Sequence, residues 1–233
     1  MNDTLSIAAI ICAAGSSSRM GGIKKEYQKI DNNITVLGSS VLALMAVPSV
    51  KVIIAVIPEN DEAAARESLP ENCRNEFGHR IVFVSGGNTR QISVYNALKF
   101  LAVKNLCFSK PDYVLIHDGA RPWVTVTLIE KLIDAAVLYN AVIPVLPVTE
   151  TPKEIENGQV RYVKNHLKRV NVCAAQTPQG FKFPEIFHAH EKAAEINEEF
   201  TDDAEIWGRF CGKVAVIDGE ALNKKITFPE DLK

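Results

Sequence analysis

Short apolar runs that alternate with helical patterns constrain the fold of this chain more than any other feature. The runs are nearly continuous in valine, isoleucine, leucine and alanine, which is typical of strands buried on both faces of a mainly parallel sheet. We predict strands at Ser6–Cys12, Lys51–Ile57, Ile81–Val84, Tyr113–Ile116, Ala141–Val145, Val172–Ala175 and Val214–Ile217.

The segments between these runs carry helical patterns, several of them bounded by proline. Thr127, followed three residues later by Glu130, predicts a capping box at the start of one helix. Strands that alternate with helices predict an α/β three-layer sandwich. The expected helices are Val36–Ala46, Glu59–Leu69, Thr89–Ala102, Thr125–Tyr139 and Pro184–Glu195.

Composition limits the class of protein. The chain has 233 residues, of which 47% are hydrophobic and 23% charged, with 26 Lys+Arg against 28 Asp+Glu. It is too apolar and too balanced in charge for a disordered chain, and it lacks the basic excess of a nucleic-acid binder. The length fits one large domain or at most two. We expect a single domain over residues 1–233 and no nucleic-acid partner.

The cysteines and the N-terminal region predict a cytoplasmic protein. The five cysteines are odd in number and show no C-x-x-C spacing, which disfavours a zinc cluster or a disulfide framework and fits a reducing compartment. No basic segment precedes the apolar run from Leu5 to Ala14, so a buried strand explains the run better than a signal peptide does. No stretch approaches the ~18 apolar residues that span a bilayer, so we expect no membrane partner.

A polar stretch, residues 147–170, interrupts the alternation. Asn157-Gly158 lies there between the alternating segments Glu154–Glu156 and Gln159–Val163, which is a strong β-hairpin signal. A hairpin inserted in an α/β domain often projects from it as an arm. Two interpretations stay open on these residues: a solvated surface hairpin, and an arm that docks on a second subunit.

The loop after the first predicted strand has the composition of a phosphate site. Residues 13–25 read Ala-Ala-Gly-Ser-Ser-Ser-Arg-Met-Gly-Gly-Ile-Lys-Lys. Small residues let backbone N–H groups approach an anion, and Arg19 and Lys25 add positive charge. The loop matches neither the Walker A motif nor the dinucleotide fingerprint. A flexible strand–helix turn is the alternative interpretation.

Two further strand ends carry polar residues. Gly86-Gly87-Asn88-Thr89-Arg90 follows the third predicted strand, and His117-Asp118-Gly119-Ala120-Arg121 follows the fourth. Ligands of open α/β sheets bind at this edge. Asp118 is a candidate Mg²⁺ ligand and Arg121 a candidate anion ligand. The alternatives are a capped turn at the first loop and a buried Asp118–Arg121 pair at the second, and we expect His117 to be structural.

Later clusters are less informative by themselves. Thr201-Asp202-Asp203 fits a helix N-cap with an acidic first turn. The pair Lys224-Lys225 fits a solvated face.

The motifs follow one another along nearly the whole chain. They are Ala13-Ala14-Gly15 with Arg19-Met20-Gly21 and Lys25, Gly86-Gly87 with Arg90 and Ser93, His117-Asp118 with Ala120-Arg121-Pro122, Gln176-Thr177-Pro178-Gln179, Thr201-Asp202-Asp203-Ala204, and Lys225-Ile226-Thr227 with Pro229-Glu230-Asp231-Leu232. In this order and spacing they resemble the 2-C-methyl-D-erythritol 4-phosphate cytidylyltransferase family of the non-mevalonate isoprenoid pathway.

The resemblance implies a Rossmann-like nucleotidyltransferase fold and a homodimer interlocked by the hairpin arm. It implies transfer of CMP from CTP to 2-C-methyl-D-erythritol 4-phosphate, with release of pyrophosphate. The acceptor phosphate oxygen is already ionised, so catalysis by position and charge needs no general base.

The resemblance also implies roles for individual residues. CTP would be bound by Ala13, Ala14, Gly15, Gly87, Asn88, Ser93 and Gly119. Arg19 and Lys25 would stabilise charge at the α-phosphate, and Asp118 would hold Mg²⁺. Arg169 and Lys225 would position the acceptor phosphate for attack. The acceptor itself would be received by Arg121, Thr151, Arg169, Thr177 and Thr201.

Several positions depart from the family pattern. Asn88 replaces a frequent Asp, Gly119 a frequent Ala, and Glu205 a usual Ser beside the acceptor motif. The family continues beyond the position of Lys233 into a last helix, so we expect either a short helix or a truncated chain.

Two other functions remain open on the sequence. A ribitol-5-phosphate cytidylyltransferase would share the CTP motifs and the acceptor threonines. A non-catalytic nucleotide-binding module is the alternative of another class, and the joint presence of Arg19, Lys25, Asp118 and Lys225 disfavours it.

Overall fold

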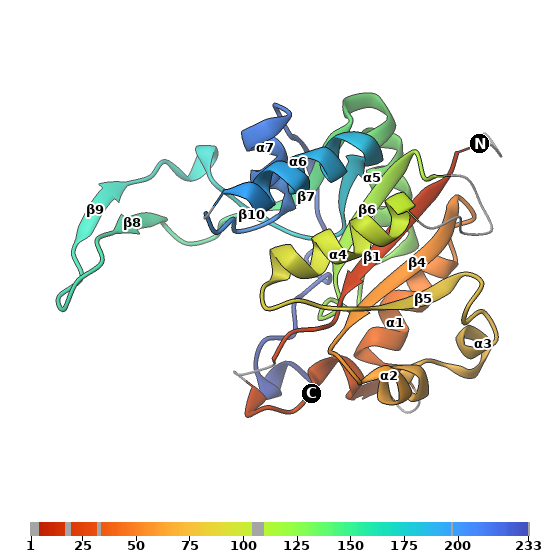
Figure 1. The fold of residues 1–233 in the computed structure, drawn as a ribbon. Helices are drawn as coiled ribbons and strands as arrows, with labels where there is room; N and C mark the ends of the chain where they lie inside the picture. Colours follow the sequence, from red (N-terminus) through yellow and green to blue (C-terminus); the bar gives the residue numbers. More distant parts are fainter. Residues whose placement is uncertain (1–4, 17–19, 32–33, 104–109, 197, 233) are drawn as a thin grey trace.

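The computed structural model describes residues 5–16, 20–31, 34–103, 110–196 and 198–232 (Figure 1). A central sheet organises the molecule. Its strands are β1 Ile7–Cys12, β4 Val50–Ile57, β5 Ile81–Ser85, β6 Tyr113–Asp118, β7 Ala141–Pro147, β10 Cys173–Ala175, β11 Gln179–Lys182 and β12 Ala215–Asp218.

The eight strands are joined in the order β10-β7-β11-β6-β1-β4-β5, and β12 pairs with β7. The pairs among β6, β1, β4 and β5 are parallel, as is the pair of β12 with β7. β11 inserts antiparallel between β6 and β7. Every predicted strand is present, and the sheet is mainly parallel as expected, whereas β11 was not predicted from the sequence.

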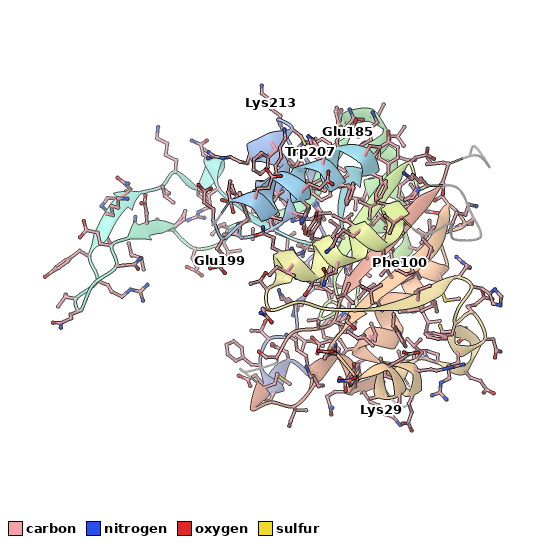
Figure 2. All side chains as sticks on the ribbon, in the orientation of Figure 1. Lys29, Phe100, Glu185, Glu199, Trp207 and Lys213 are labelled. Atoms are coloured by element: carbon pink, nitrogen blue, oxygen red, sulfur yellow. The ribbon has the colours of Figure 1, made fainter. Side chains whose placement is uncertain are left out.

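Helices cover both faces of the sheet, which confirms the three-layer α/β architecture. Side chains of β1 alternate between the faces: Ile7, Ala9 and Ile11 join one apolar cluster, and Ala8 and Ile10 join the other. The first face is covered by α1 Val36–Met45, α2 Glu62–Ser68 and α5 Val126–Tyr139; the second by α4 Arg90–Val103, α6 Phe183–Glu195 and α7 Asp203–Phe210. Trp207 of α7 packs into the second cluster (Figure 2).

Helix α5 begins differently from the prediction. Thr125 is its N-cap: its backbone is extended and its Oγ1 accepts a hydrogen bond from Leu128 N at 3.0 Å. Thr127 therefore lies inside the first turn, and the predicted capping box with Glu130 is wrong. The cap is placed by the packing of Leu128 and Ile129 into the core, which the local pattern of polar residues does not reveal.

The predicted hairpin is present and extends away from the sheet (Figure 1). Its strands, β8 Lys153–Ile155 and β9 Val163–His166, are antiparallel. The alternating pattern predicts a second strand from residue 159, but β9 begins at Val163. The intervening loop is closed by a hydrogen bond from Glu156 N to Tyr162 O. The difference arises because the hairpin has no buried face to set its register.

Short elements complete the chain. They are β2 Lys29–Asp31, β3 Ile34–Thr35, α3 Glu71–Arg74, and the 3₁₀ helices η2 Lys25–Tyr27, η3 Arg169–Asn171 and η4 Pro229–Leu232. Within the described ranges, no helix is long and apolar enough to cross a membrane.

Candidate active site

A cavity of about 460 Å³ opens at the carboxyl ends of β1, β5 and β6. This is the sheet edge where open α/β folds bind ligands. The cavity is lined by Cys12, Ala14, Gly15, Ser16, Lys25, Glu26, Gly87, Asn88, Thr89, Arg90, Ser93, Asp118, Ala120 and Lys225. Segments far apart in the chain therefore meet there, among them most of the residues that the resemblance implies for CTP.

The first two loops meet so closely that one of them requires glycine. A Cβ at Gly86 would lie 2.4 Å from the Cβ of Ala14 and 3.1 Å from Ser93 Oγ. Ser93 in turn accepts a hydrogen bond from Gly87 N at 3.0 Å and donates one to Thr89 O at 2.8 Å. The two loops are thus in direct contact at the wall of the cavity.

Gly119 lies against β1 rather than in the cavity. A Cβ there would lie 2.9 Å from the carbonyl oxygen of Cys12 and 3.2 Å from the Cβ of Ala13. Glycine fits this position without any shift of β1, whereas an alanine would require a small displacement of one strand end.

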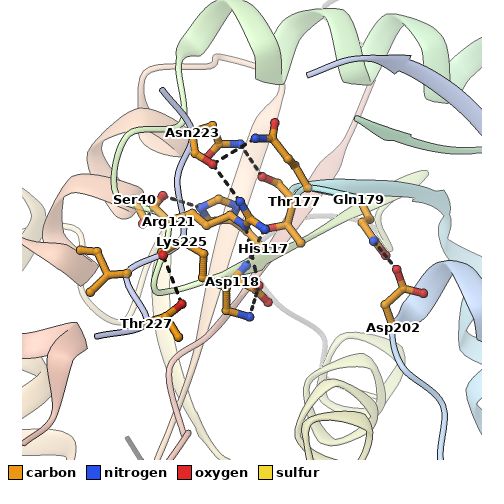
Figure 3. Close-up of polar contacts among 12 residues, drawn as sticks. Ser40, His117, Asp118, Arg121, Thr177, Gln179, Asp202, Asn223, Lys225 and Thr227 are labelled. Carbon is orange, nitrogen blue, oxygen red and sulfur yellow. Dashed lines mark hydrogen bonds and ion pairs between the residues drawn. The ribbon is translucent and has the colours of Figure 1, made fainter. Parts of the chain in front are cut away.

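Asp118 is the electrostatic centre of the cavity (Figure 3). Its carboxylate lies 2.8 Å from Lys225 Nζ, 3.4 Å from Arg90 Nε and 3.8 Å from Arg121 Nε. Burial by itself raises the pKa of this carboxyl, but Arg90, Lys225 and Arg121 outweigh burial and hold its pKa well below the usual range. Asp118 is therefore ionised at every physiological pH.

A second set of contacts positions Lys225 at the cavity. Ile226 N donates to Ala120 O at 2.8 Å, and Lys25 Nζ donates to Ile226 O at 3.0 Å. Arg121 Nη1 donates to the carbonyl of the buried Asn223 at 2.8 Å. The late segment is thus fixed on both sides of Lys225, which explains how a lysine of an unremarkable pair reaches Asp118.

His117 and Thr177 form a hydrogen-bond network with the backbone of Asp118. Asp118 N donates to Thr177 Oγ1 at 2.9 Å, and the Thr177 hydroxyl lies 3.1 Å from His117 Nδ1. His117 Nε2 lies 3.1 Å from the carbonyl of Arg121. Because the carbonyl of Arg121 can only accept, the ring proton lies on Nε2, and Nδ1 of the neutral ring accepts from the Thr177 hydroxyl. Burial lowers the pKa of His117 to about 4, so the ring is neutral, as expected for a structural histidine.

The structure brings together most of the predicted CTP residues. Ala14, Gly15, Gly87, Asn88 and Ser93 line the cavity with Lys25, Asp118 and Lys225. Ala13 is buried behind the loop, and Arg121 lies beside Asp118. Arg19 lies outside the described residues.

Three of the predicted acceptor residues, Thr151, Arg169 and Thr201, do not line the cavity. Thr151 and Arg169 lie at the base of the arm, where Arg169 Nη2 approaches Thr151 Oγ1 to 3.5 Å. Thr201 lies before α7, and both its N–H and its hydroxyl donate to Glu205 at 2.7 Å. The N-cap expected in that segment is present, with Asp202 Oδ1 accepting from Glu205 N.

Sequence reasoning assigned no role at the cavity to three residues that the structure connects to it. Arg90 lines it and joins Asp118 to the buried Asp203, which in turn contacts His190 of α6. The glycine loop gave a signal for Arg90, since a cation at a helix start beside such a loop is unusual. His190 gave none, because a single histidine on a helix resembles many surface histidines.

Comparisons with known proteins show the family to which the chain belongs. Residues 7–233 match the family model "IspD: 2-C-methyl-D-erythritol 4-phosphate cytidylyltransferase". A protein of that name from Bacillus mycoides (strain KBAB4) is 36% identical over 223 residues, which cover 96% of this chain and 93% of that protein. A bifunctional enzyme IspD/IspF from Brucella anthropi is 37% identical over 97% of this chain; the match spans 54% of that longer protein.

Solved structures show the same similarity. The crystal structure of 4-diphosphocytidyl-2C-methyl-D-erythritol synthase from Anaerococcus prevotii DSM 20548 gives a TM-score of 0.81 at 32% identity, over 99% of this chain and 94% of that one. The 2-C-methyl-D-erythritol 4-phosphate cytidylyltransferase from Thermus thermophilus gives 0.73 at 29% identity, over 96% of this chain and 94% of that one. The family model and these relatives show that the chain belongs to the 2-C-methyl-D-erythritol 4-phosphate cytidylyltransferase family of enzymes.

Proposed function

We propose that this chain transfers CMP from CTP to 2-C-methyl-D-erythritol 4-phosphate, giving 4-diphosphocytidyl-2-C-methyl-D-erythritol and pyrophosphate in the non-mevalonate isoprenoid pathway. The observation that carries the proposal is the Asp118–Lys225 contact inside a cavity walled by two small-residue loops. The names of the matched relatives supply the acceptor.

CTP binds along the two loops. The triphosphate lies against the backbone of Ala13, Ala14 and Gly15, where small side chains leave the N–H groups accessible. The cytosine and ribose lie toward Gly87, Asn88 and Ser93, with Gly119 behind them. The polar atoms around Gly87 are already held by Ser93, so this wall needs little rearrangement when nucleotide enters.

Positive charge stabilises the transition state. Lys25, Lys225 and Arg90 line the cavity, and we assign Arg19 the same role from its place in the first loop. The α-phosphate gains charge as the acceptor oxygen approaches, and fixed cations in a partly desolvated cavity stabilise that charge. The acceptor phosphate attacks as an anion, so the residues described here supply position and charge rather than a general base.

The residues fit a magnesium ion held mainly by the substrate. Asp118 is ionised and faces the cavity, and a single carboxylate with several phosphate oxygens is a common Mg²⁺ environment. Among the described residues no group of three or more metal-ligating side chains occurs, which disfavours a metal cage built by protein alone. When bound, Mg²⁺ supplies neutralisation of phosphate charge; Asp118 would hold it and Lys225 would turn toward the phosphates.

The acceptor site is completed by a second copy of the chain. Thr151 and Arg169 contact each other on the arm but do not line the cavity. The arm also exposes apolar side chains: Tyr162 is 63% and Val170 90% exposed. Exposed apolar patches of this kind are typical of interfaces. A homodimer in which each arm reaches the partner's cavity covers these side chains and delivers Arg169 to the acceptor phosphate.

The other acceptor residues contribute from the chain that binds CTP. Arg121 and Lys225 reach the acceptor phosphate from beside Asp118, and Thr201 from the start of α7. Thr177 acts indirectly, since its hydroxyl is shared between Asp118 N and His117. We propose one domain over residues 1–233 with residues 147–170 as its arm, working in the cytoplasm, where CTP is available.

Pyrophosphate release from CTP and Mg²⁺ tests the proposal. It is to be measured with 2-C-methyl-D-erythritol 4-phosphate and with ribitol 5-phosphate separately. Turnover with ribitol 5-phosphate alone would contradict the proposed acceptor. CTP binding without turnover of either acceptor would favour a non-catalytic nucleotide-binding module.

A further inference from the structure

A buried carboxylate connects the cavity to helix α6. Asp203 is fully buried, and its Oδ2 lies 2.7 Å from Arg90 Nη1, while its Oδ1 lies 3.1 Å from His190 Nε2. Arg90 extends this series of contacts to the cavity, because its Nε lies 3.4 Å from Asp118 Oδ1. Four side chains from α6, α7, α4 and β6 thus form one line from the interior to the cavity.

His190 is an unusual residue for its position. Its neighbours on the buried face of α6 are Ile186, Ala189 and Ala193, so an apolar side chain matches that face. The imidazole instead stacks on Tyr95 of α4, with ring centroids 6.4 Å apart and planes 13° apart. His190 Nδ1 is buried with no hydrogen-bond partner in the described part of the chain. Leaving a buried polar atom unpaired is unfavourable, so the bond from Nε2 must offset it.

Asp203 needs both of its partners. A buried carboxylate is strongly unfavourable unless its oxygens are paired, and here one oxygen is paired by Arg90 and the other by His190. If His190 is removed, Arg90 alone is left to pair the carboxylate of Asp203. The guanidinium then turns deeper toward Asp203 and away from Asp118 and the cavity.

We propose that His190 is a positioning residue for nucleotide binding: through Asp203 it fixes the guanidinium of Arg90 at the wall of the CTP cavity. The proposal rests on the proposed function, since it takes the cavity to hold CTP. It assigns His190 no contact with substrate. Its effect is therefore on CTP affinity, whereas the residues proposed for the acceptor phosphate, Arg121, Arg169 and Lys225, are not members of the line from His190 through Asp203 to Arg90.

Matched substitutions at this position separate positioning from packing. His190→Phe keeps a flat ring against Tyr95 but cannot bond Asp203. In His190→Gln the amide nitrogen reaches the place of Nε2 and restores the bond. The amide of His190→Asn is too short to do so, although its polarity is the same. His188→Phe is the control, since His188 lies on the exposed side of the same helix beside Glu191.

The first experiment measures the Kd of CTP with Mg²⁺ by calorimetry, together with the KM of each substrate and the melting temperature. We expect His190→Phe and His190→Asn to raise the CTP Kd about tenfold, the effect expected of one lost charge-assisted hydrogen bond, with the acceptor KM unchanged. We expect His190→Gln and His188→Phe to bind CTP within about twofold of the wild type. Equal CTP affinities for the Gln and Asn variants would overturn the proposal. The comparison of these two variants remains decisive even if the Phe variant fails to fold.

A double-mutant cycle tests the route through Arg90. If His190 acts through Arg90, adding His190→Asn to Arg90→Gln weakens CTP binding no further. Additive losses would show that His190 acts independently, which contradicts the proposal. The Kd of CTP can be measured without turnover. A wild type that binds CTP but turns over neither acceptor would therefore contradict the proposed function and leave the affinity test of His190 intact. A wild type that binds no CTP would overturn both.

Discussion

Lys225 Nζ lies 2.8 Å from Asp118 Oδ2, although the two residues are 107 positions apart in the chain. The contact joins the end of a central strand to a late segment with little regular structure. It places a cation beside a buried carboxylate at the wall of the cavity. The proposed transfer of CMP depends on both members of this pair.

Lys225→Met removes the charge while keeping most of the side-chain length. We expect kcat to fall by about 10²–10³, because a cation aimed at developing phosphate charge is lost. The fold should persist, since Asp118 keeps Arg90 and Arg121. The matched control is Lys224→Met, at the exposed neighbouring position. Comparable losses in the two variants, measured as pyrophosphate release, would argue against a specific role for Lys225.

Gly86→Ala tests the close packing of the two loops. The added Cβ would meet Ala14 at 2.4 Å, so the loops must separate, and we expect the KM for CTP to rise about tenfold. Gly208→Ala in α7 is the control, because its Cβ would meet nothing within 4 Å. That change should leave kinetics unaltered and raise stability by about 0.5–1 kcal/mol, since alanine favours helix. Unchanged CTP kinetics in Gly86→Ala would mean that the loops do not form the nucleotide site.

Most strands of the central sheet could be predicted from the sequence, because buried strands are continuous apolar runs. β11 escaped prediction because Gln179-Gly180-Phe181-Lys182 is mixed in polarity; it is a strand because β6 and β7 bond it on both sides. The cavity could be predicted from its loops. The link from His190 through Asp203 to Arg90 could not, since it arises from the packing of α6 against α4 and leaves no local motif.

The buried, neutral His117 is expected to lower the free energy of unfolding at acid pH. The unfolded histidine binds a proton near its ordinary pKa of 6.5, whereas the folded one does so only near about 4. Between these values the unfolded chain binds more protons, so the free energy of unfolding decreases as the pH falls. The expected loss from this group is about 3 kcal/mol at pH 4.

Urea unfolding at a series of pH values checks this contribution. The wild type should lose stability between pH 6.5 and 4 more steeply than His117→Gln, whose amide nitrogen retains the bond to Arg121 O. Parallel curves for the two proteins would show that His117 is not held neutral by the fold.

The proposed completion of each site by the partner's arm predicts complementation between two variants. Lys225→Met disables the cavity of its own chain, and Arg169→Ala disables the arm that serves the partner. Each variant alone should be inactive, but refolding them together should restore roughly a quarter of wild-type activity, because half of the dimers are mixed and each has one intact site. Sedimentation should show a dimer throughout. A mixture as inactive as its components would contradict a site completed by the partner's arm.

The proposed function requires the Asp118–Lys225 cavity to transfer CMP to a methylerythritol phosphate. The most direct measurement is pyrophosphate release by the purified wild type with CTP and Mg²⁺, run in parallel with 2-C-methyl-D-erythritol 4-phosphate and with ribitol 5-phosphate, and with Lys225→Met as the inactive reference. We predict turnover with the methylerythritol phosphate that disappears in the variant. Turnover with ribitol 5-phosphate alone, or no turnover of either acceptor, would contradict the account.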